Sequence, residues 1–476
     1  MTLRDRCRSA VAAVLLGAAF LPAAAHAAAP ETGIADDRVL LAGGQAADDA
    51  VAAWAALGVD VVRIHAAWNR IAPAHDATGP PAGFKADDPN DPAYNWGALD
   101  AAVDRVRAAG MRVMLTVTGP GPVWTSTVPT RHNPRYRPDP RRFADFATAV
   151  ARRFGPQVDR YIVWNEPNLP LWLQPQSSCV AGRCTPVSPH VYRALAAAAV
   201  PAIRAADPGA QVLVGALGPR GSSAHTANAN LRPLAFLRAM GCVSAAYRPV
   251  RSGACRGFKP LTADGFAFHP HGVRNAPGTP FANPDDVDLA SLGRLEAVLD
   301  GLGRAGALRS PSGARLGLYL DEYGYQTSPP DRFLGVTPAT QDRWLQEAAY
   351  RAWRDPRVRI LTQYAWIDEP AGTDGSFGGW QSGLRFADGR AKPALAHFAV
   401  PFFLDAARSR LWGQVRPGSG PQQVTIQRRA RGSAAWRPIA TLTTGADGAW
   451  SRTLPLARGA SYRFTAGDRT SAAMTR

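Results

Sequence analysis

The stretch that decides the fold is YIVWNEPN, which runs from Tyr161 to Asn168. It begins as a short apolar, β-branched strand and ends abruptly in the polar pair Asn165-Glu166. Similar apolar runs recur along the chain, each followed by an Ala-rich amphipathic stretch. Eight strands are expected, at Val39–Ala42, Asp60–His65, Arg112–Val117, Tyr161–Trp164, Gln211–Gly215, Gly265–His269, Gly317–Leu320 and Ile360–Trp366.

Helical periodicity fills the gaps between these strands. Leu99, Val103 and Val106 have the three-to-four spacing of one buried helical face. Eight strand–helix alternations favour a closed (β/α)8 TIM barrel over an open doubly wound sheet, and no Gly-rich dinucleotide fingerprint follows the first strand. The helices are expected, among other places, at Ala46–Leu57, Ala98–Ala109, Arg142–Phe154 and Thr340–Arg354.

The last 70 residues have a different texture, with apolar and polar residues in alternation and Gly-rich turns between short strands. We expect a small C-terminal antiparallel β-sandwich over residues 408–476, after a catalytic domain over residues 28–405. The tryptophans of this region, Trp412, Trp436 and Trp450, are more often core residues than ligand contacts. Its strands are expected at Trp412–Val415, Gln423–Arg428, Trp436–Thr443, Trp450–Leu454 and Tyr462–Ala466.

The N-terminus is typical of a secretory signal peptide. Arg4, Arg6 and Arg8 precede an apolar run, and Ala25-His26-Ala27 is an A-x-A-like cleavage site. We expect residues 1–27 to be removed and the mature protein to be secreted, with an uncleaved anchor as the competing interpretation. No later apolar run is long enough for a membrane span.

Cysteine usage agrees with export. Cys7 lies in the signal peptide, which leaves Cys179, Cys184, Cys242 and Cys255. An even count in an exported chain indicates disulfides, and we expect the local pairs Cys179–Cys184 and Cys242–Cys255. A zinc site is the competing interpretation, but the spacing matches zinc patterns poorly.

The 476-residue chain is basic, with 54 Lys and Arg against 37 Asp and Glu, for a net charge of +17. Three of these cations are lysines and the other 51 are arginines. They are scattered rather than clustered, so we expect no specific nucleic-acid partner. Loss of the signal peptide, with three arginines and one aspartate, leaves +15, which favours adhesion to anionic cell-surface polymers.

Two glutamates carry the expected chemistry. Glu166 ends the fourth strand and Glu322 ends the seventh. Active-site groups of a barrel lie at the C-terminal ends of its strands, so both should face one cleft. Two carboxyl groups across a glycosidic bond can protonate the leaving oxygen and attack or activate water. The alternative is that both glutamates are solvated loop residues without a catalytic role. Asp321 competes as nucleophile, but strand alternation should turn it to the opposite face.

At these residues the chain resembles the retaining glycoside hydrolases of clan A, and families 39 and 5 most. The resemblance covers roughly residues 30 to 405 and rests on Trp164-Asn165-Glu166-Pro167-Asn168 and on Asp321-Glu322-Tyr323-Gly324. It implies that Glu166 is the acid/base, that Glu322 is the nucleophile and that Asn165 binds the sugar 2-OH. It also implies that Arg63, near the end of strand two, keeps Glu322 ionised; an ion pair elsewhere in the barrel is equally expected.

Two histidines follow the sixth strand. Many members of the clan have His-x-Tyr there, with the tyrosine against the nucleophile, whereas this chain has His269 and His271. The partner of the nucleophile therefore stays open. We expect both histidines to contact substrate; a metal site is the alternative, but the sequence offers no third ligand.

Aromatic side chains near strand ends are candidate sugar contacts, because their faces stack on pyranose rings. His65 and Trp68 follow strand two, and Trp366 ends strand eight. Core packing is the alternative for each, and it is favoured for Trp124 after strand three. Trp172 lies in a long insertion after Glu166, which we expect to shape the substrate groove.

The sequence thus predicts a secreted retaining glycoside hydrolase that cleaves O-glycosidic bonds of a polysaccharide or oligosaccharide without metal or cofactor. A non-hydrolytic carbohydrate-binding protein on the same barrel is the alternative. The presence of both Glu166 and Glu322 argues against it, because binding alone needs neither carboxylic acid.

Overall fold

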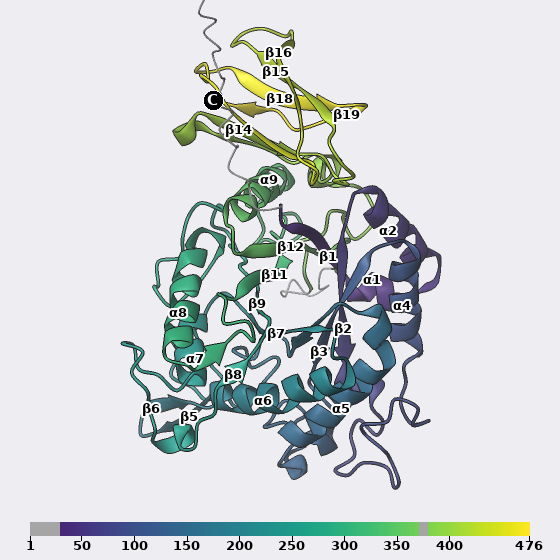
Figure 1. The fold of residues 1–476 in the computed structure, drawn as a ribbon, viewed down its shortest axis with the longest axis vertical. Helices are drawn as coiled ribbons and strands as arrows, with labels where there is room; N and C mark the ends of the chain where they lie inside the picture. The colour runs from purple at the N-terminus through teal and green to yellow at the C-terminus, as the bar shows by residue number, and fades with distance from the viewer. Residues whose placement is uncertain (1–28, 371–378) are drawn as a thin grey trace, which may run out of the picture.

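The computed structural model describes residues 29–370 and 379–476 of the chain (Figure 1). The expected signal peptide, residues 1–27, lies outside the described residues, so its cleavage stays a prediction. Within the described part, no helix combines the length and apolar character that a membrane crossing needs.

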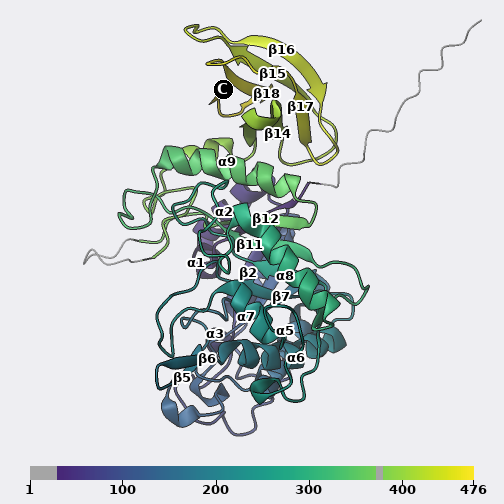
Figure 2. The same ribbon diagram turned by 90° about the vertical axis from the view of Figure 1, so that its left-hand side faces the viewer.

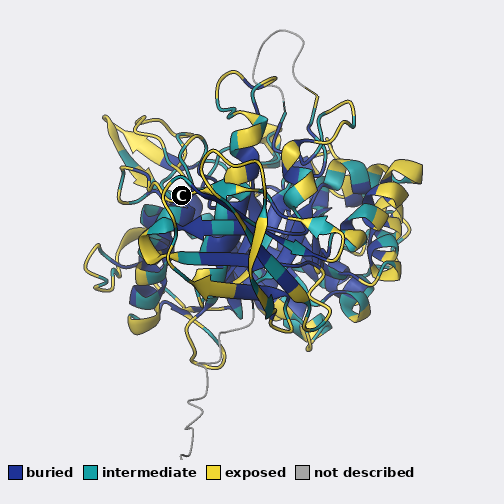
Figure 3. Ribbon diagram, turned by 90° about the horizontal axis from the view of Figure 1, so that it is seen from above, coloured by how far each residue is buried: buried dark blue, intermediate teal, exposed yellow. Residues whose placement is uncertain are grey.

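Eight parallel strands close into a barrel, which confirms the predicted (β/α)8 fold. They follow chain order around the barrel, and β12 pairs with β1 to close it. Figure 3 shows buried residues concentrated toward the middle of the molecule and exposed residues on its outer turns and loops. The strands are β1 (Glu31–Ala35), β2 (Val61–Ala67), β3 (Arg112–Thr118), β4 (Arg160–Val163), β7 (Gln211–Leu217), β9 (Gly265–Phe268), β11 (Gly317–Tyr323) and β12 (Val358–Tyr364).

The first strand was predicted in the wrong place. Residues 39–42 belong to helix α1 (Asp37–Ala42), and β1 lies before it. The side chain of Asp36 caps the helix by accepting a hydrogen bond from the Val39 N–H at 3.2 Å. A short apolar run cannot be assigned to helix or strand by periodicity alone, and the capping residue decides here.

The other elements follow the expected alternation. Leu99, Val103 and Val106 are buried on one face of α4, as their spacing predicts. The helices are α1, α2 (Gly44–Ala56), α3 (Trp68–Ile71), α4 (Gly97–Ala108), α5 (Pro140–Phe154), α6 (Ser188–Ala206), α7 (Pro233–Met240), α8 (Leu292–Arg304), α9 (Pro338–Arg354) and α10 (Pro393–His397). Two short parallel strands, β8 (Leu261–Thr262) and β10 (Leu308–Arg309), pair outside the barrel.

Both predicted disulfides are present. Cys179–Cys184 joins a hairpin of β5 (Ser177–Val180) and β6 (Arg183–Pro186) inside the insertion after Glu166. Cys242–Cys255 ties the segment after α7. Since these sulfurs are paired, they offer no thiolates to zinc, and the competing zinc interpretation falls.

The C-terminal residues form two antiparallel sheets, as predicted. Val424, Ile426, Tyr462 and Phe464 of one sheet pack with Trp450 of the other. Phe402–Asp405 was expected to belong to the first domain, which was predicted to end at residue 405, but it pairs with β14 in this sandwich. One sheet holds β13 (Phe402–Asp405), β14 (Arg410–Gln414) and β17 (Ala449–Thr453); the other holds β15 (Gln423–Arg429), β16 (Arg437–Thr443), β18 (Ser461–Ala466), β19 (Arg469–Thr470) and β20 (Met474–Thr475).

The sandwich packs on the barrel through α9. Tyr350 of this helix contacts Phe403 and Trp412, with ring centroids 4.9 and 5.8 Å apart, and its hydroxyl donates to Asp405 at 2.7 Å. Figure 2 shows the sandwich beyond α9, at one end of the molecule. Trp412 is thus a core residue, as expected, although it belongs to the interface between the two domains.

Candidate active site

The structure brings Glu166 and Glu322 together across the barrel. The Nδ1 atom of His269 lies 3.1 Å from Glu166 Oε1 and 3.6 Å from Glu322 Oε2. These two oxygens therefore lie no farther apart than the sum of the two distances, 6.7 Å. Residues 156 positions apart in the chain share one site because β4 and β11 end at the same rim of the barrel.

A strained backbone positions Glu166. Trp164 and Glu166 have φ values of 70° and 38°, and Ala216 on the neighbouring β7 has 46°. The Glu166 N–H donates to the Ala216 carbonyl at 2.8 Å, which joins the two turns. Each left-handed non-glycine residue costs about 1–3 kcal/mol, and such strain gathers at functional sites. Trp172 also fixes the carboxyl group, because its indole N–H donates to Oε2 at 3.2 Å.

Cations hold Glu322 in its ionised form. Burial raises the pKa of this carboxyl group, but the charges of His269, Arg63 and His271 lower it by more, so the net pKa lies well below the ordinary value. Arg63 Nη1 lies 2.6 Å from Oε1, and His271 Nε2 lies 3.7 Å from Oε2. His271 thus occupies the place beside Glu322 that the sequence left open.

Asp321 lies against the same cations, and the expectation that it faces away from Glu322 was wrong. Arg63 Nη2 lies 3.5 Å from Asp321, and the register of β11 shifts between Leu320 and Tyr323, which breaks the strict alternation. Asp321 is fully buried, whereas the side chain of Glu322 is 11% exposed. Only Glu322 is therefore accessible to a substrate.

His269 is a buried cation that links three carboxyl groups. Burial lowers its pKa, but Glu322 and Asp321 and the hydrogen bonds raise it, to a net value of about 10. Its Nε2 lies 3.2 Å from Asp321. The imidazole is therefore protonated at neutral pH and donates through both nitrogens.

The same histidines bear on the metal alternative. Ligand atoms of His269, His271 and Glu322 lie within 4.8 Å of one another, so the structure supplies the third ligand that the sequence did not. However, a protonated His269 has no lone pair for a metal, and the Arg63 guanidinium already pairs with Glu322. These residues fit a network of ion pairs better than a cation site.

Arg63 also orients Asn165, which is 2% exposed. The Nη2 group of Arg63 donates to Asn165 Oδ1 at 2.6 Å. Because the amide oxygen is occupied, the NH2 group of Asn165 is the part that remains to donate to a substrate hydroxyl. The geometry therefore agrees with the expected role of Arg63 beside Glu322. It does not agree with the alternative, in which Arg63 forms an ion pair elsewhere in the barrel.

The predicted aromatic contacts divide into two groups. His65 belongs to the site: its ring stacks on Trp172 with centroids 5.7 Å apart, and its Nδ1 bonds to Asp37. The side chains of Trp68 and Trp366 do not, because they are 1% and 5% exposed and pack in the core.

The packing around these tryptophans explains their burial. Trp68 stacks on Phe146 at 5.5 Å, and Trp366 meets Trp54 edge-on at 6.3 Å. Trp124 also lies in the core, as favoured from the sequence. Position near a strand end was too weak a signal, because the chain after a strand can turn back onto the helices before it reaches the cleft.

Sequence reasoning missed two aromatic residues of the cleft. Trp380 stacks on His271 with centroids 5.6 Å apart, and Tyr364 of β12 meets Trp380 edge-on at 6.1 Å. Burial, and then the charge of Glu322, raise the pKa of Tyr364. Tyr364 ends β12, the strand that was predicted to end at Trp366. An aromatic residue therefore does lie at the end of this strand, two residues before Trp366. Trp380 lies in a Gly-rich segment with no local pattern.

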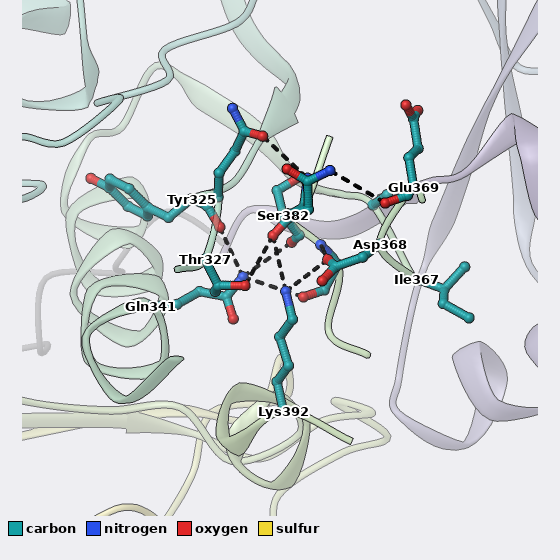
Figure 4. Close-up of polar contacts among 12 residues, drawn as sticks. Tyr325, Thr327, Gln341, Ile367, Asp368, Glu369, Ser382 and Lys392 are labelled. Atoms are coloured by element: carbon teal, nitrogen blue, oxygen red, sulfur yellow. Dashed lines mark hydrogen bonds and ion pairs between the residues drawn. The ribbon is translucent and has the colours of Figure 1, made fainter. Parts of the chain in front are cut away.

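A buried ion pair fixes the segment that carries Trp380 (Figure 4). Lys392 Nζ donates to Asp368 Oδ1 at 2.7 Å and to the Gln381 carbonyl at 2.9 Å. The Gly383 N–H donates to the same Asp368 oxygen at 2.8 Å. Burial lowers the pKa of Lys392 to about 8, against the attraction of Asp368. One of the three lysines of the chain thus holds the residue next to Trp380.

A pocket of about 170 Å³ opens beside Glu166. Its walls are mainly apolar, with one cation. Besides Glu166 and His271, the lining includes Leu169, Pro219, Arg220, Asn230, Val273, Leu334 and Trp380. Since the lining includes Glu166 and not Glu322, the pocket lies on the Glu166 side of the carboxyl pair.

Comparisons with known proteins agree with the barrel fold. Residues 31–240 match the family model of Cellulase (glycosyl hydrolase family 5). No curated protein matches the chain. Among solved structures, a family 39 glycoside hydrolase from Bacteroides cellulosilyticus WH2 is 13% identical, with a TM-score of 0.51 over 90% of this chain and 82% of that one. A glucosidase from Croceicoccus marinus is also 13% identical, with a TM-score of 0.50 over 92% and 95%. At such identities these two structures support the fold alone.

Proposed function

We propose that the chain, whose residues 31–240 match the model of glycosyl hydrolase family 5, is a retaining glycoside hydrolase that cleaves O-glycosidic bonds of an oligosaccharide or polysaccharide. Glu322 is the nucleophile and Glu166 the acid/base. The observation that carries the proposal is the unequal surroundings of the two carboxyl groups. The buried imidazolium of His269 lies within 3.6 Å of both Glu166 and Glu322, whereas Arg63 pairs with Glu322 only.

The first step forms a glycosyl-enzyme intermediate. The Glu322 carboxylate attacks the anomeric carbon while Glu166 donates its proton to the glycosidic oxygen, so that the bond to the leaving sugar breaks. His269, Arg63 and His271 lower the pKa of Glu322 and so favour its ionised form. The NH2 group of Asn165 is placed to donate to the 2-OH of the sugar, a contact that strengthens in the transition state.

The second step releases the sugar. Glu166, now ionised, takes a proton from water, whose oxygen attacks the anomeric carbon and breaks the ester to Glu322. Trp172 and His269 both donate to Glu166, so the ionised base finds its hydrogen-bond partners already in place. Two displacements on one carbon retain the anomeric configuration.

The separation of the two carboxyl groups is the quantity that distinguishes retaining from inverting enzymes. Retaining enzymes hold the two groups about 5–5.5 Å apart, and inverting enzymes about 6.5–9.5 Å apart to admit a water. One pair of oxygens here lies within 6.7 Å, a bound set by their distances to His269. That bound includes the retaining distance and overlaps the lower end of the inverting range, so the stereochemistry of the product decides between the two mechanisms.

The pocket beside Glu166 favours a leaving group with an apolar face. The acid protonates the leaving oxygen, so the leaving sugar lies on the acid side. Trp380 and the aliphatic residues Leu169, Val273 and Leu334 line that pocket. Sugar rings present apolar faces to such walls, which fits a pyranose as the leaving group.

The test is the stereochemistry of the reaction together with Glu322→Gln. Proton NMR of the first product released from an aryl glycoside or oligosaccharide panel should show the anomer of the substrate. Glu322→Gln should lose turnover while it keeps the wild-type circular dichroism spectrum. An inverted product, or near-normal turnover by Glu322→Gln, would refute the mechanism. Binding of oligosaccharides from the panel without release of any product would favour a carbohydrate-binding protein instead.

We also propose that the mature enzyme acts outside the cytoplasm. The signal-like residues 1–27 and two disulfides support this location. N-terminal sequencing of protein from the culture medium should begin after Ala27. Retention of the native N-terminus in the cell fraction would contradict it.

A further inference from the structure

Seven arginines gather at one end of the β-sandwich, which we call the arginine end. Strand register brings them together: Arg428 of β15 pairs with Arg437 of β16, and Gln427 pairs with Arg463 of β18. The turn before β18 supplies Arg458, and the Gly459 N–H donates to the carbonyl of Arg476. The arginine end comprises Arg428, Arg429, Arg431, Arg437, Arg458, Arg463 and Arg476.

Nothing in the described part of the chain neutralises these charges. Residues 402–476 contain twelve arginines and three aspartates, with no lysine or glutamate. In residues 29–370 and 379–476, the one ion pair formed by this domain is Arg408 with Asp405, at 3.0 Å. Asp447 accepts from the N–H of Ala29, where the chain enters the barrel. By contrast, many barrel arginines have carboxylate partners, as Arg153 has Asp100 and Arg238 has Asp285.

Two of these guanidinium groups are held in place. Those of Arg463 and Arg429 lie 4.3 and 4.9 Å from the centroid of the Trp436 ring. Arg463 Nε also donates to Gln427 Oε1 at 2.7 Å. Side chains fixed in this way lose little conformational entropy when they bind. A guanidinium has five donors in a rigid fork, so most of the donors of Arg463 remain for a ligand.

We propose that the arginine end is a binding site for an acidic polysaccharide, whose carboxylate or sulfate groups pair with several arginines at once. Unpaired like charges on adjacent strands destabilise the fold, and a polyanion relieves that repulsion. An arginine fork matches a carboxylate or sulfate in a bidentate manner. A single small anion would reach one or two of the seven arginines, whereas a polymer can span strands about 4.8 Å apart.

A glycan is favoured over a nucleic acid for two reasons. The first rests on the proposed function, since a polysaccharide bound beside the barrel would bring substrate to the enzyme. The second is independent of it. Single-stranded nucleic acids bind by stacking bases on aromatic faces, but the guanidinium groups of Arg463 and Arg429 already lie over the Trp436 ring.

The test is calorimetry of the full mature chain with polygalacturonate, with uncharged dextran of similar length as control. Binding to polygalacturonate and none to dextran is expected. The test variant replaces four arginines of this end by alanine, at Arg428, Arg429, Arg437 and Arg463. The matched control removes the same charge from exposed barrel arginines that form no ion pair in the described part, at Arg107, Arg141, Arg304 and Arg309.

Affinity should fall at least tenfold in the test variant and by less than twofold in the control. Equal losses in both variants would mean attraction by net charge alone and would overturn the site. Tighter binding of single-stranded DNA than of polygalacturonate would assign the surface to nucleic acid instead. Should the fourfold variant not fold, Arg428→Glu/Arg458→Glu reverses two exposed charges and should give the same loss.

Turnover of a small aryl glycoside separates this proposal from the proposed function. It should be unchanged in the test variant, because the arginine end touches no active-site residue. An enzyme without glycosidase activity would still give a valid binding result.

Discussion

Replacement of His269 by glutamine should move the pH profile of the enzyme in a predictable direction. The imidazolium is fully buried and lies between Glu166, Asp321 and Glu322. Its charge is the largest of the influences that lower the pKa of Glu322 below its ordinary value. Glutamine keeps a donor of similar length and removes the positive charge, so the variant isolates the electrostatic contribution.

The magnitude follows from the contacts that are lost. A hydrogen bond to a charged group contributes about 1.5–3 kcal/mol, and one pKa unit corresponds to about 1.4 kcal/mol. The pKa of Glu322 should therefore rise by about 1–2 units, and because the nucleophile must be ionised, the acid limb of the profile moves to higher pH. The weaker hold on Glu166, 3.1 Å away, should also lower kcat by about 10- to 150-fold.

The assay is kcat/KM against pH on an aryl glycoside, since its limbs report groups of the free enzyme. His75→Gln is the control, because His75 is exposed and its backbone carbonyl alone bonds within the described part. Its profile should match the wild type. An acid limb of His269→Gln that stays in place or moves to lower pH would refute the idea that this cation keeps Glu322 ionised, even if kcat falls.

Two further substitutions test the supports of the site. Trp172→Phe keeps an aromatic ring but removes the donor 3.2 Å from Glu166, so kcat/KM should fall about 2- to 12-fold. The fall should be larger for substrates with poor leaving groups than for nitrophenyl glycosides. Equal losses on the two kinds of substrate would contradict a role of Trp172 beside the proposed acid. Lys392→Met leaves Asp368 as an unpaired buried charge and should destabilise the fold by about 3–5 kcal/mol in urea unfolding. Addition of Asp368→Asn should recover part of that loss, and a further loss would show that the carboxylate has another partner.

The barrel could be predicted because its signal is repeated. Seven of the eight strands lie where apolar runs between amphipathic helices indicated them, and a closed barrel is the fold that such alternation favours. The one failure, at residues 39–42, came from a run too short to show a period. The decisive feature there was the side chain of Asp36, which a pattern of apolar residues does not include.

Only those site residues that lie at or next to strand ends could be predicted from the sequence. Glu166, Glu322, Arg63 and Asn165 meet in the structure because strand ends of a barrel converge. Trp380 could not be found, because its place depends on a long segment after β12 and on the buried Lys392 that fixes it. Such contacts depend on loop conformation, for which the sequence has no periodic signal.

The relation of Asp321 to Glu322 failed for a subtler reason. Alternation holds while a strand keeps its register, and β11 loses its register between Leu320 and Tyr323. A shift of this kind lets two adjacent carboxylates face one cation. It left Asp321 as a buried partner for His269 and Arg63 rather than a residue on the far face.

Arg63 then explains how the site keeps two roles apart with nearly identical groups. One of its nitrogens pairs with Glu322, and the other bonds Asn165 and approaches Asp321. It makes no contact with Glu166, which receives its hydrogen bonds from Trp172 and His269. A guanidinium keeps its charge across the whole working range of pH, so its contribution to the ionised form of Glu322 does not change with pH. Because Arg63 touches Glu322 and not Glu166, it makes the surroundings of the two carboxyl groups unequal, which agrees with the separate roles proposed for them.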